Sequence, residues 1–188
     1  MKIYFIRLIP VLLCFGFVGH KQAAPVTITQ TTELKIVFIR HGEKPESGNN
    51  LTCKGLNRSL LLPAVIEKKF GTPDFVYVPA LVMGDKTSRA RMFETITPMA
   101  VKHNLDINSK FDENDYAGIA NDIRQKSGTV LVVWEHKAIS GILNELGIQD
   151  TPKWKGDDFN TILIVMFHNG KAILTEDTEG LNPADDCP

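Results

Sequence analysis

The sequence lacks an excess of positive charge, because 21 Lys and Arg residues stand against 22 Asp and Glu residues, a net charge of −1. Residues 1–24 hold three of the basic residues and no acid, so the rest of the chain has 18 basic and 22 acidic residues, a net charge of −4. A protein that binds a nucleic-acid backbone normally carries a strong basic excess. We therefore expect no nucleic-acid partner, and any phosphate site must be a local concentration of positive charge.

Long apolar runs are also scarce, and the longest lies at the N-terminus, from Leu8 to Val18, after Lys2 and Arg7. A positive flank followed by about a dozen apolar residues is typical of a secretory signal peptide and is short for a membrane span. We expect residues 1–24 to be a signal peptide that is cleaved. The mature chain, residues 25–188, would then be periplasmic or secreted, with no stable membrane insertion. An uncleaved N-terminal anchor is the alternative.

Cysteine is rare: Cys14 lies in the predicted signal peptide, and Cys53 and Cys187 are the two that remain in the mature chain. Neither of these two has C-x-x-C spacing or a nearby histidine, so we expect no zinc site. In an oxidising compartment the pair could form one disulfide that ties down the C-terminal tail. Two unpaired thiols are the alternative.

The mature chain has the composition of one soluble globular domain, since 43% of all residues are hydrophobic and 23% are charged. Near-continuous apolar runs at residues 34–39 and 129–134 predict strands that are buried on both faces. Further patterns predict a short strand at 75–78 and a hairpin around Asn169-Gly170. Helices are predicted at 53–70, interrupted by Pro63, and at 87–103. A third helix should begin after Asp112 as its N-cap, and a fourth should end at Gly147. This alternation predicts an α/β fold, a single three-layer α/β/α domain with a mainly parallel central sheet and a C-terminal hairpin.

Polar residues with chemical potential follow directly on the two most apolar predicted strands. The segment Arg40-His41-Gly42-Glu43 comes after the first, and Glu135-His136 comes after the strand at 129–134. In open α/β sheets, reactive groups gather at the carboxyl ends of the strands. A single loop histidine is more often a surface or capping residue, but two histidines placed at strand ends together with arginines form a candidate site.

A third cluster opens the helix predicted at 87–103 and contains Arg89 and Arg91. An arginine at a helix N-terminus opposes the helix dipole, so its position needs an explanation. A bound anion would supply one, because helix N–H groups and a guanidinium both suit phosphate oxygens. We apply this explanation to Arg91, and we expect Arg89 to be an ordinary surface arginine paired with Glu94 or Asp85.

Four motifs stand in order along the chain: Arg40-His41-Gly42-Glu43, Leu51-Thr52-Cys53-Lys54-Gly55, Thr87 with Arg91 and Thr95, and an apolar strand that leads to His136. In order and spacing the chain from about residue 34 to residue 147 resembles the histidine phosphatase superfamily, in the branch that also holds phosphoglycerate mutases. The likeness is greatest to its small bacterial members.

The resemblance implies that His41 is the nucleophile and becomes phosphorylated. Three side chains would surround the phosphoryl group: Arg40, Arg91 and His136. Arg40 and Arg91 would also bind the substrate, with Glu43 and Thr52 as further candidates, although Glu43 is equally suited to holding the loop or an arginine. Catalysis of this kind rests on positioning and electrostatic stabilisation. We therefore expect a metal-independent phosphatase with no cofactor, acting on a small phosphorylated substrate.

The chain departs from the larger family members in one respect, since no residue clearly matches their acidic proton donor. Glu113 and Glu135 are weak candidates. Glu113 is equally explained as an acid in the first turn of a helix, and strand alternation would turn Glu135 away from the site unless the strand has ended. Two other functions stay open: a binding module of this fold that holds an anion without catalysis, and a phosphomutase. We make no prediction of the oligomeric state.

Overall fold

The two most apolar strands form the centre of the sheet in the computed structural model, which describes residues 33–188. Strand β1 (Lys35–Arg40) pairs in parallel with β4 (Thr129–Trp134), with Arg40 opposite Trp134 at the carboxyl end. Their central residues are fully buried, as expected for strands covered on both faces. The predicted signal peptide lies outside the described residues.

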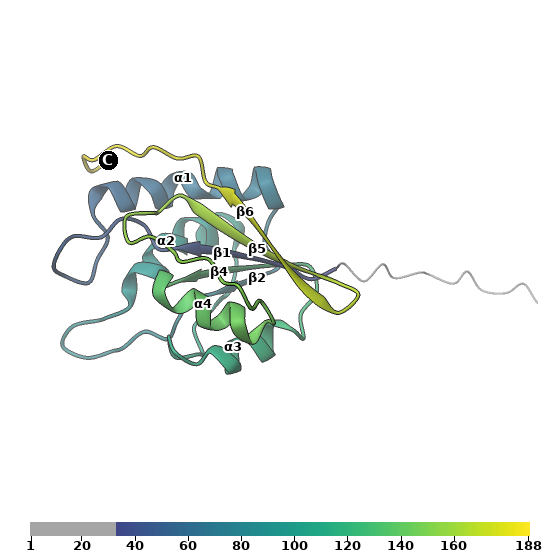
Figure 1. Ribbon diagram of the computed structural model, residues 1–188. Coiled ribbons are helices and arrows are strands. Elements are labelled where there is room, and N and C mark those ends of the chain that lie inside the picture. The colour runs from purple at the N-terminus through teal and green to yellow at the C-terminus, as the bar shows by residue number, and fades with distance from the viewer. Residues whose placement is uncertain (1–32) are drawn as a thin grey trace, which may run out of the picture. The chain divides into compact units, whose positions relative to one another are not determined.

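The other strands extend the sheet on both sides, and the order is β3-β2-β4-β1-β5-β6. Strands β2 (Phe75–Tyr77) and β3 (Ile107–Asn108) continue the parallel part beside β4. Strand β5 (Thr161–His168) is antiparallel to β1 and forms a hairpin with β6 (Lys171–Thr178), as Figure 1 shows. The predicted mainly parallel sheet with a C-terminal hairpin is confirmed.

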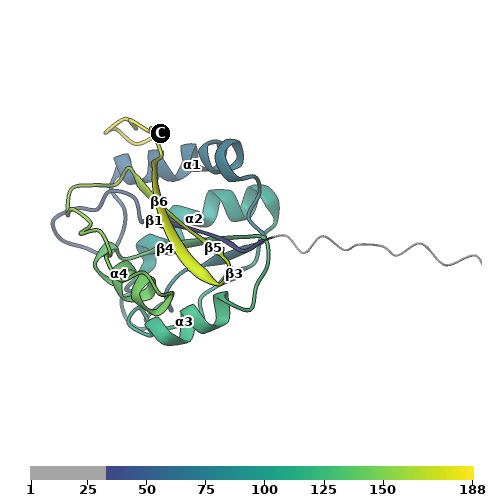
Figure 2. The same cartoon turned by 45° about the vertical axis from the view of Figure 1, so that its right-hand side comes forward.

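Four helices cover the two faces of the sheet, and Figures 1 and 2 show the three layers from two sides. Helices α1 (Cys53–Phe70) and α2 (Ala90–His103) pack on one face, where their apolar residues join Val37, Ile39 and Leu131 in a buried cluster. Helices α3 (Tyr116–Ile123) and α4 (His136–Glu145) pack on the other face. No helix among residues 33–188 is long and apolar enough to cross a bilayer.

The structure differs locally from the sequence-based expectations. Strand β3 has only two residues, and no apolar run marks it. The side chain of Asp115, and not that of Asp112, caps α3 by accepting from Gly118 N. Helix α2 begins at Ala90, after Arg89 in a left-handed conformation (φ 62°), three residues later than predicted.

The C-terminal residues return to the beginning of α1. Cys53, the first residue of α1, forms a disulfide with Cys187, with a Cα–Cα distance of 4.5 Å. Figure 1 shows the segment after β6 running along α1 towards the loop that precedes this helix. A disulfide restricts the unfolded chain, here through a ring that spans 134 positions.

Candidate active site

The ends of β1 and β4 bring two histidines and one glutamate together. His41 is fully buried, and its Nδ1 lies 2.7 Å from the carbonyl oxygen of Gly42. Its Nε2 lies 3.2 Å from Oε2 of Glu135, and Nδ1 of His136 contacts Oε1 of the same carboxylate. The parallel pairing of β1 with β4 thus brings the two histidines together, and both contact the same carboxylate, that of Glu135.

The hydrogen bonds of His41 fix the role of each ring nitrogen. A carbonyl only accepts, so Nδ1 must carry a hydrogen and donate to Gly42. Burial raises the pKa of Glu135, but the hydrogen bond from His41 and the charges of His41, His136 and Arg40 outweigh it and lower the pKa to about 2. Glu135 is therefore ionised at neutral pH, and its Oε2 can only accept a hydrogen bond at Nε2 of His41.

Glu135 reaches the site because β4 has ended. The strand stops at Trp134, and Glu135 occupies the N-cap position of α4 with φ −73° and ψ 125°. The alternation of side chains along a strand no longer applies there. His136 follows as the first residue of α4, and burial, together with the nearby charge of Arg40, lowers its pKa and favours the neutral ring.

Arg40 is the buried cation of the site, with 2% of its surface exposed. Its Nη1 donates to the carbonyl oxygens of Gly156 at 2.8 Å and Asp158 at 3.0 Å, and its guanidinium carbon lies 3.9 Å from the ring centre of Phe159. Among the described residues, Nε of Arg40 has no hydrogen-bond partner. A buried guanidinium that is held in place and has a free donor suits an anionic ligand.

Arg91 stands in a different setting. Its Nη2 donates to the carbonyl of Gly48, and its Nε donates to that of Asn50 at 3.4 Å. One helical turn later, Oγ1 of Thr95 accepts from the backbone N–H of Gly42 at 2.9 Å. The start of α2 is therefore attached to the loop that carries His41, while the Arg91 side chain is held by the loop at residues 44–52.

Glu43 and Thr52, both expected as substrate-binding candidates, have partners within the protein. The carboxylate of Glu43 accepts from Nε and Nη2 of Arg58 at 2.9 and 2.7 Å. Oγ1 of Thr52 accepts from Gly55 N as the N-cap of α1 and donates to the carbonyl oxygen of Glu43. The structure thus uses both side chains to hold residues 41–43, which we call the nucleophile loop after the role that the sequence analysis expects of His41.

Glu113, the other proton-donor candidate, lies at the edge of the site. Its carbonyl accepts from the indole nitrogen of Trp134 at 3.0 Å, and its carboxylate lies 3.7 Å from Nε of Arg89. Burial raises the pKa of Glu113 above its ordinary value, against the opposing charge of Arg89. The charge of Glu135 raises this pKa further and that of His41 lowers it, so Glu113 is electrostatically coupled to both residues.

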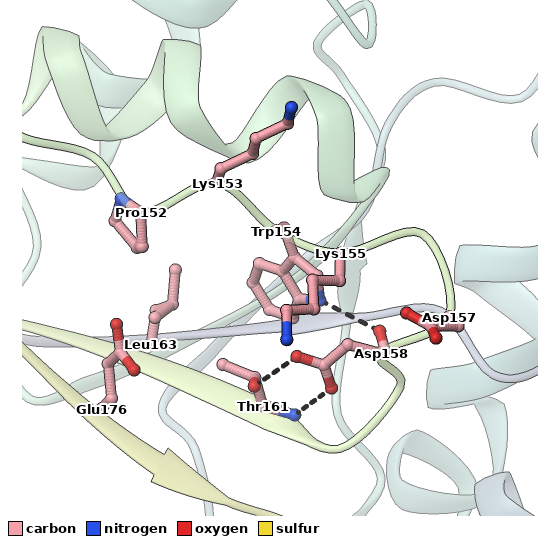
Figure 3. Close-up of a pocket in the computed structure, with 9 residues that line it drawn as sticks. All are labelled: Pro152, Lys153, Trp154, Lys155, Asp157, Asp158, Thr161, Leu163 and Glu176. Atoms are coloured by element: carbon pink, nitrogen blue, oxygen red, sulfur yellow. Dashed lines mark hydrogen bonds between the residues drawn. The ribbon is translucent and has the colours of Figure 1, made fainter.

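A cavity of about 490 Å³ is lined in part by the loop whose carbonyls bind Arg40. Figure 3 shows its lining, which comes from that loop and from β5 and β6. The indole nitrogen of Trp154 donates to the carbonyl of Asp158, whose carboxylate accepts from Thr161. The loop at residues 152–160 therefore both contacts Arg40 and lines this cavity.

Some of these residues were missed by the sequence analysis. Phe159, whose ring also lies edge-on to His41 with centroids 6.1 Å apart, follows an ordinary polar loop. Arg58 is one of several basic residues on α1, and no local pattern marks it as buried. Residues 33–188 contain no group of three or more His, Cys, Asp or Glu side chains arranged to hold a metal ion.

Comparison with solved structures supports the fold. The chain superposes on the protein histidine phosphatase SixA complexed with tungstate with a TM-score of 0.56 and 15% identity, covering 77% of this chain and 97% of that one. On a phosphoserine phosphatase mutant from Entamoeba histolytica, in complex with phosphoserine, it superposes with a TM-score of 0.54 and 14% identity, covering 78% of this chain and 97% of that one. On a phosphoglycerate mutase from Bacillus anthracis the TM-score is 0.50 at 13% identity, and the match covers 78% of this chain and 93% of that one. No family model matches the sequence, and no curated protein is significantly similar to it.

These likenesses establish the fold, which is the one predicted from the four motifs. They include phosphatases and a mutase, so the fold alone does not decide the reaction. The reaction must be argued from the side chains at the ends of β1 and β4.

Proposed function

We propose that this protein is an exported, metal-independent phosphatase that removes a phosphoryl group from a small substrate through a phosphohistidine intermediate on His41. The observation that carries the proposal is the shared carboxylate: Glu135 binds both His41 and His136, beside the buried guanidinium of Arg40. Nδ1 of His41 is fixed by Gly42, so Nε2 is the nitrogen that faces the site. Solved structures of the same fold contain tungstate and phosphoserine, in agreement with a phosphoryl site.

The first step needs a neutral Nε2 and a proton for the leaving group. Glu135 takes the proton from Nε2, which then attacks phosphorus while the bond from phosphorus to the substrate oxygen breaks. Glu113 gives its proton to that oxygen. Arg40 and Arg91 stabilise the charge on the phosphoryl oxygens.

The second step returns the site to its resting state. Glu113, now a carboxylate, takes a proton from water, whose oxygen attacks phosphorus. The N–P bond breaks, Nε2 recovers its proton from Glu135, and inorganic phosphate leaves. Glu113 is assigned as the acid because burial raises its pKa, whereas Glu135 is ionised in the resting site.

Hydrolysis is tested with the purified mature chain and a panel of phosphomonoesters and phosphoanhydrides, with and without EDTA. We expect release of inorganic phosphate that EDTA does not reduce. Transfer of the phosphoryl group to another hydroxyl of the same molecule would establish a mutase instead. Vanadate binding with no turnover on any ester would establish an anion-binding module, and dependence on a divalent metal would contradict the mechanism.

The role of Glu113 has its own test, because a proton donor matters most for a poor leaving group. We expect Glu113→Gln to lower kcat for alkyl phosphates by about 10²-fold and to leave kcat for p-nitrophenyl phosphate nearly unchanged. Glu145→Gln, at an exposed acid on the last turn of α4, is the matched control. Equal losses on both substrates would remove Glu113 from the mechanism.

Export has a separate test, because it rests on residues 1–24. Expression of the full chain with a C-terminal tag, followed by fractionation and N-terminal sequencing, should give a periplasmic or secreted product that starts close to residue 25. A product that retains Met1 in the membrane fraction would show the uncleaved anchor instead.

A further inference from the structure

The first turn of α1 packs directly against the nucleophile loop. A Cβ atom on Gly42 would lie 2.8 Å from the carbonyl oxygen of Gly55, and a Cβ on Gly55 would overlap the backbone of Glu43. The N–H of Thr52 also donates to the carbonyl of Glu43 at 2.9 Å. With backbone against backbone, a displacement of this turn must displace the loop that carries His41.

The same turn is held from outside by residues 179–188, which we call the C-terminal strap. The disulfide joins Cys187 to Cys53, and the side-chain amide of Asn57 donates to the carbonyls of Ala184 at 3.0 Å and Asp186 at 2.6 Å. Lys54 pairs with Asp185 at 3.0 Å. Three residues of the first turn and a half of α1 are thus attached to the end of the chain.

A buried ion-pair network joins the start of the strap to the nucleophile loop. Arg58, 4% exposed, forms a two-pronged pair with Glu43 and a third contact with Glu179 through Nη1 at 2.5 Å. Glu179 is also 4% exposed, and its backbone N–H donates to Asn160 O. The side chain next to Gly42 is therefore connected through Arg58 to the strap.

We propose that the C-terminal strap positions the nucleophile loop, with Arg58 and Glu179 as positioning residues and the Cys53–Cys187 bond as a site of thiol–disulfide exchange that opens the strap. This inference rests on the proposed function. A thiolate of a dithiol reductant attacks the sulfur of Cys187, an exposed residue, and the bond to the sulfur of Cys53 breaks, which leaves Cys53 as a thiol. The second thiol of the reductant resolves the mixed disulfide, so the protein gains two thiols and two electrons and the reductant becomes a disulfide.

The disulfide is open to a reductant and lies beside the loop that holds Arg91. The disulfide lines a surface hollow of about 250 Å³ together with Asn50, Leu51 and Thr52, the end of the loop whose carbonyls hold Arg91. Opening the strap therefore frees the first turn of α1 and the Arg91 loop together. Both the attack by His41 and the binding of the phosphoryl group should weaken.

The test compares oxidised wild type, dithiothreitol-reduced wild type, Cys187→Ser and Glu179→Gln, below their melting temperatures. We expect reduction and Cys187→Ser each to lower kcat/KM by about 10- to 100-fold, to weaken vanadate binding, and to accelerate hydrogen exchange in residues 42–58. Glu179→Gln keeps the disulfide and should show smaller changes of the same kind. Reductant should have no further effect on Cys187→Ser.

The control is Asp177→Asn, which breaks an exposed pair between α1 and β6 with Lys69, at the far end of the helix. It should change none of these readouts. Faster exchange confined to the strap, with exchange at residues 42–58 and vanadate affinity unchanged, would overturn the proposal. If the oxidised wild type hydrolyses no ester, the proposed function fails, while exchange and vanadate binding still decide whether the strap positions the loop.

Discussion

The β1 side and the α2 side of the candidate site hold their arginines in different ways. Arg40 continues a buried strand, donates to backbone carbonyls of a second segment and lies over Phe159. Arg91 is partly exposed, and its hydrogen bonds go to the carbonyls of Gly48 and Asn50 in a surface loop. The position of Arg40 is therefore fixed by the core, whereas the position of Arg91 depends on the conformation of the surface loop at residues 44–52.

The comparison shows where this site is preorganised and where it must be completed. Preorganised charges stabilise a transition state without reorganising during the reaction. Arg40 meets that condition through the sheet itself. Arg91 meets it only while residues 44–52 stay in place, and their end is fixed by the first turn of α1 and the strap. Substitutions on the two sides should therefore have different consequences.

The largest effects should separate the two arginines. Arg40→Ala and Arg91→Ala should each lower kcat/KM by an amount equivalent to about 3–4 kcal/mol, because each removes charge from the phosphoryl oxygens. Only Arg40→Ala should also lower the melting temperature, since it removes a buried side chain together with its hydrogen bonds to the carbonyls of Gly156 and Asp158. Arg91→Lys should recover only part of the activity, because an ammonium keeps the positive charge but cannot make the two-pronged contact of a guanidinium.

The control for this pair is Arg124→Ala, which should leave activity unchanged and should lower the melting temperature much less than Arg40→Ala does, because the bond of Arg124 to the carbonyl of Glu145 is exposed. A loss of stability in Arg91→Ala equal to that in Arg40→Ala would contradict the contrast between the two sides.

A second, smaller effect concerns pH. Burial raises the pKa of Glu113, so this group keeps its proton to a higher pH than an exposed glutamate does. With Glu113 as the acid, kcat for alkyl phosphates should fall on the alkaline side as the proton is lost. In the Glu113→Gln variant, kcat for alkyl phosphates should be about 10²-fold lower where it does not depend on pH, and the decrease at alkaline pH should be absent. An unchanged decrease at alkaline pH in this variant would assign it to another group.

The smallest effect concerns stability and the strap. Burial raises the folded-state pKa of Glu179 to about 7, against the opposing effect of Arg58. Between the ordinary pKa of a glutamate and about 7 the folded state binds the extra proton, so stability should fall as pH rises through that window. We expect Glu179→Gln to remove a pH-dependent loss of about 3 kcal/mol in the free energy of unfolding, measured by urea unfolding from pH 4.5 to 8. Parallel curves for the two proteins would contradict the assignment.

The sequence predicted the parts of this molecule that depend on local pattern. The apolar runs of β1 and β4 predicted two buried strands, and the parallel pairing seen in the structure brings the residues that follow them to one edge of the sheet. The two-residue strand β3 could not be predicted, because it forms only by pairing with β2. The environment of Glu135 depended on where β4 ends, which a run of apolar residues does not define to within one residue.

Long-range contacts account for the rest. The pairing of Arg58 with Glu43 and Glu179 joins residues up to 121 positions apart, and the sequence contains many other ways to pair one arginine. The ring of Phe159 under Arg40 likewise depends on a loop that returns to the site from the far end of α4. Such contacts are set by tertiary packing, so neither periodicity nor motif spacing could reveal them.

The central claim is that Nε2 of His41 carries the phosphoryl group, and rapid-quench labelling with radiolabelled phenyl phosphate tests it most directly. The account predicts an adduct on the protein that is labile in acid and stable in base, as a phosphohistidine is, and that maps to His41. His41→Ala should lack the adduct and lose several orders of magnitude in kcat while still folding. Substantial turnover by His41→Ala, or an adduct on another residue, would contradict the account.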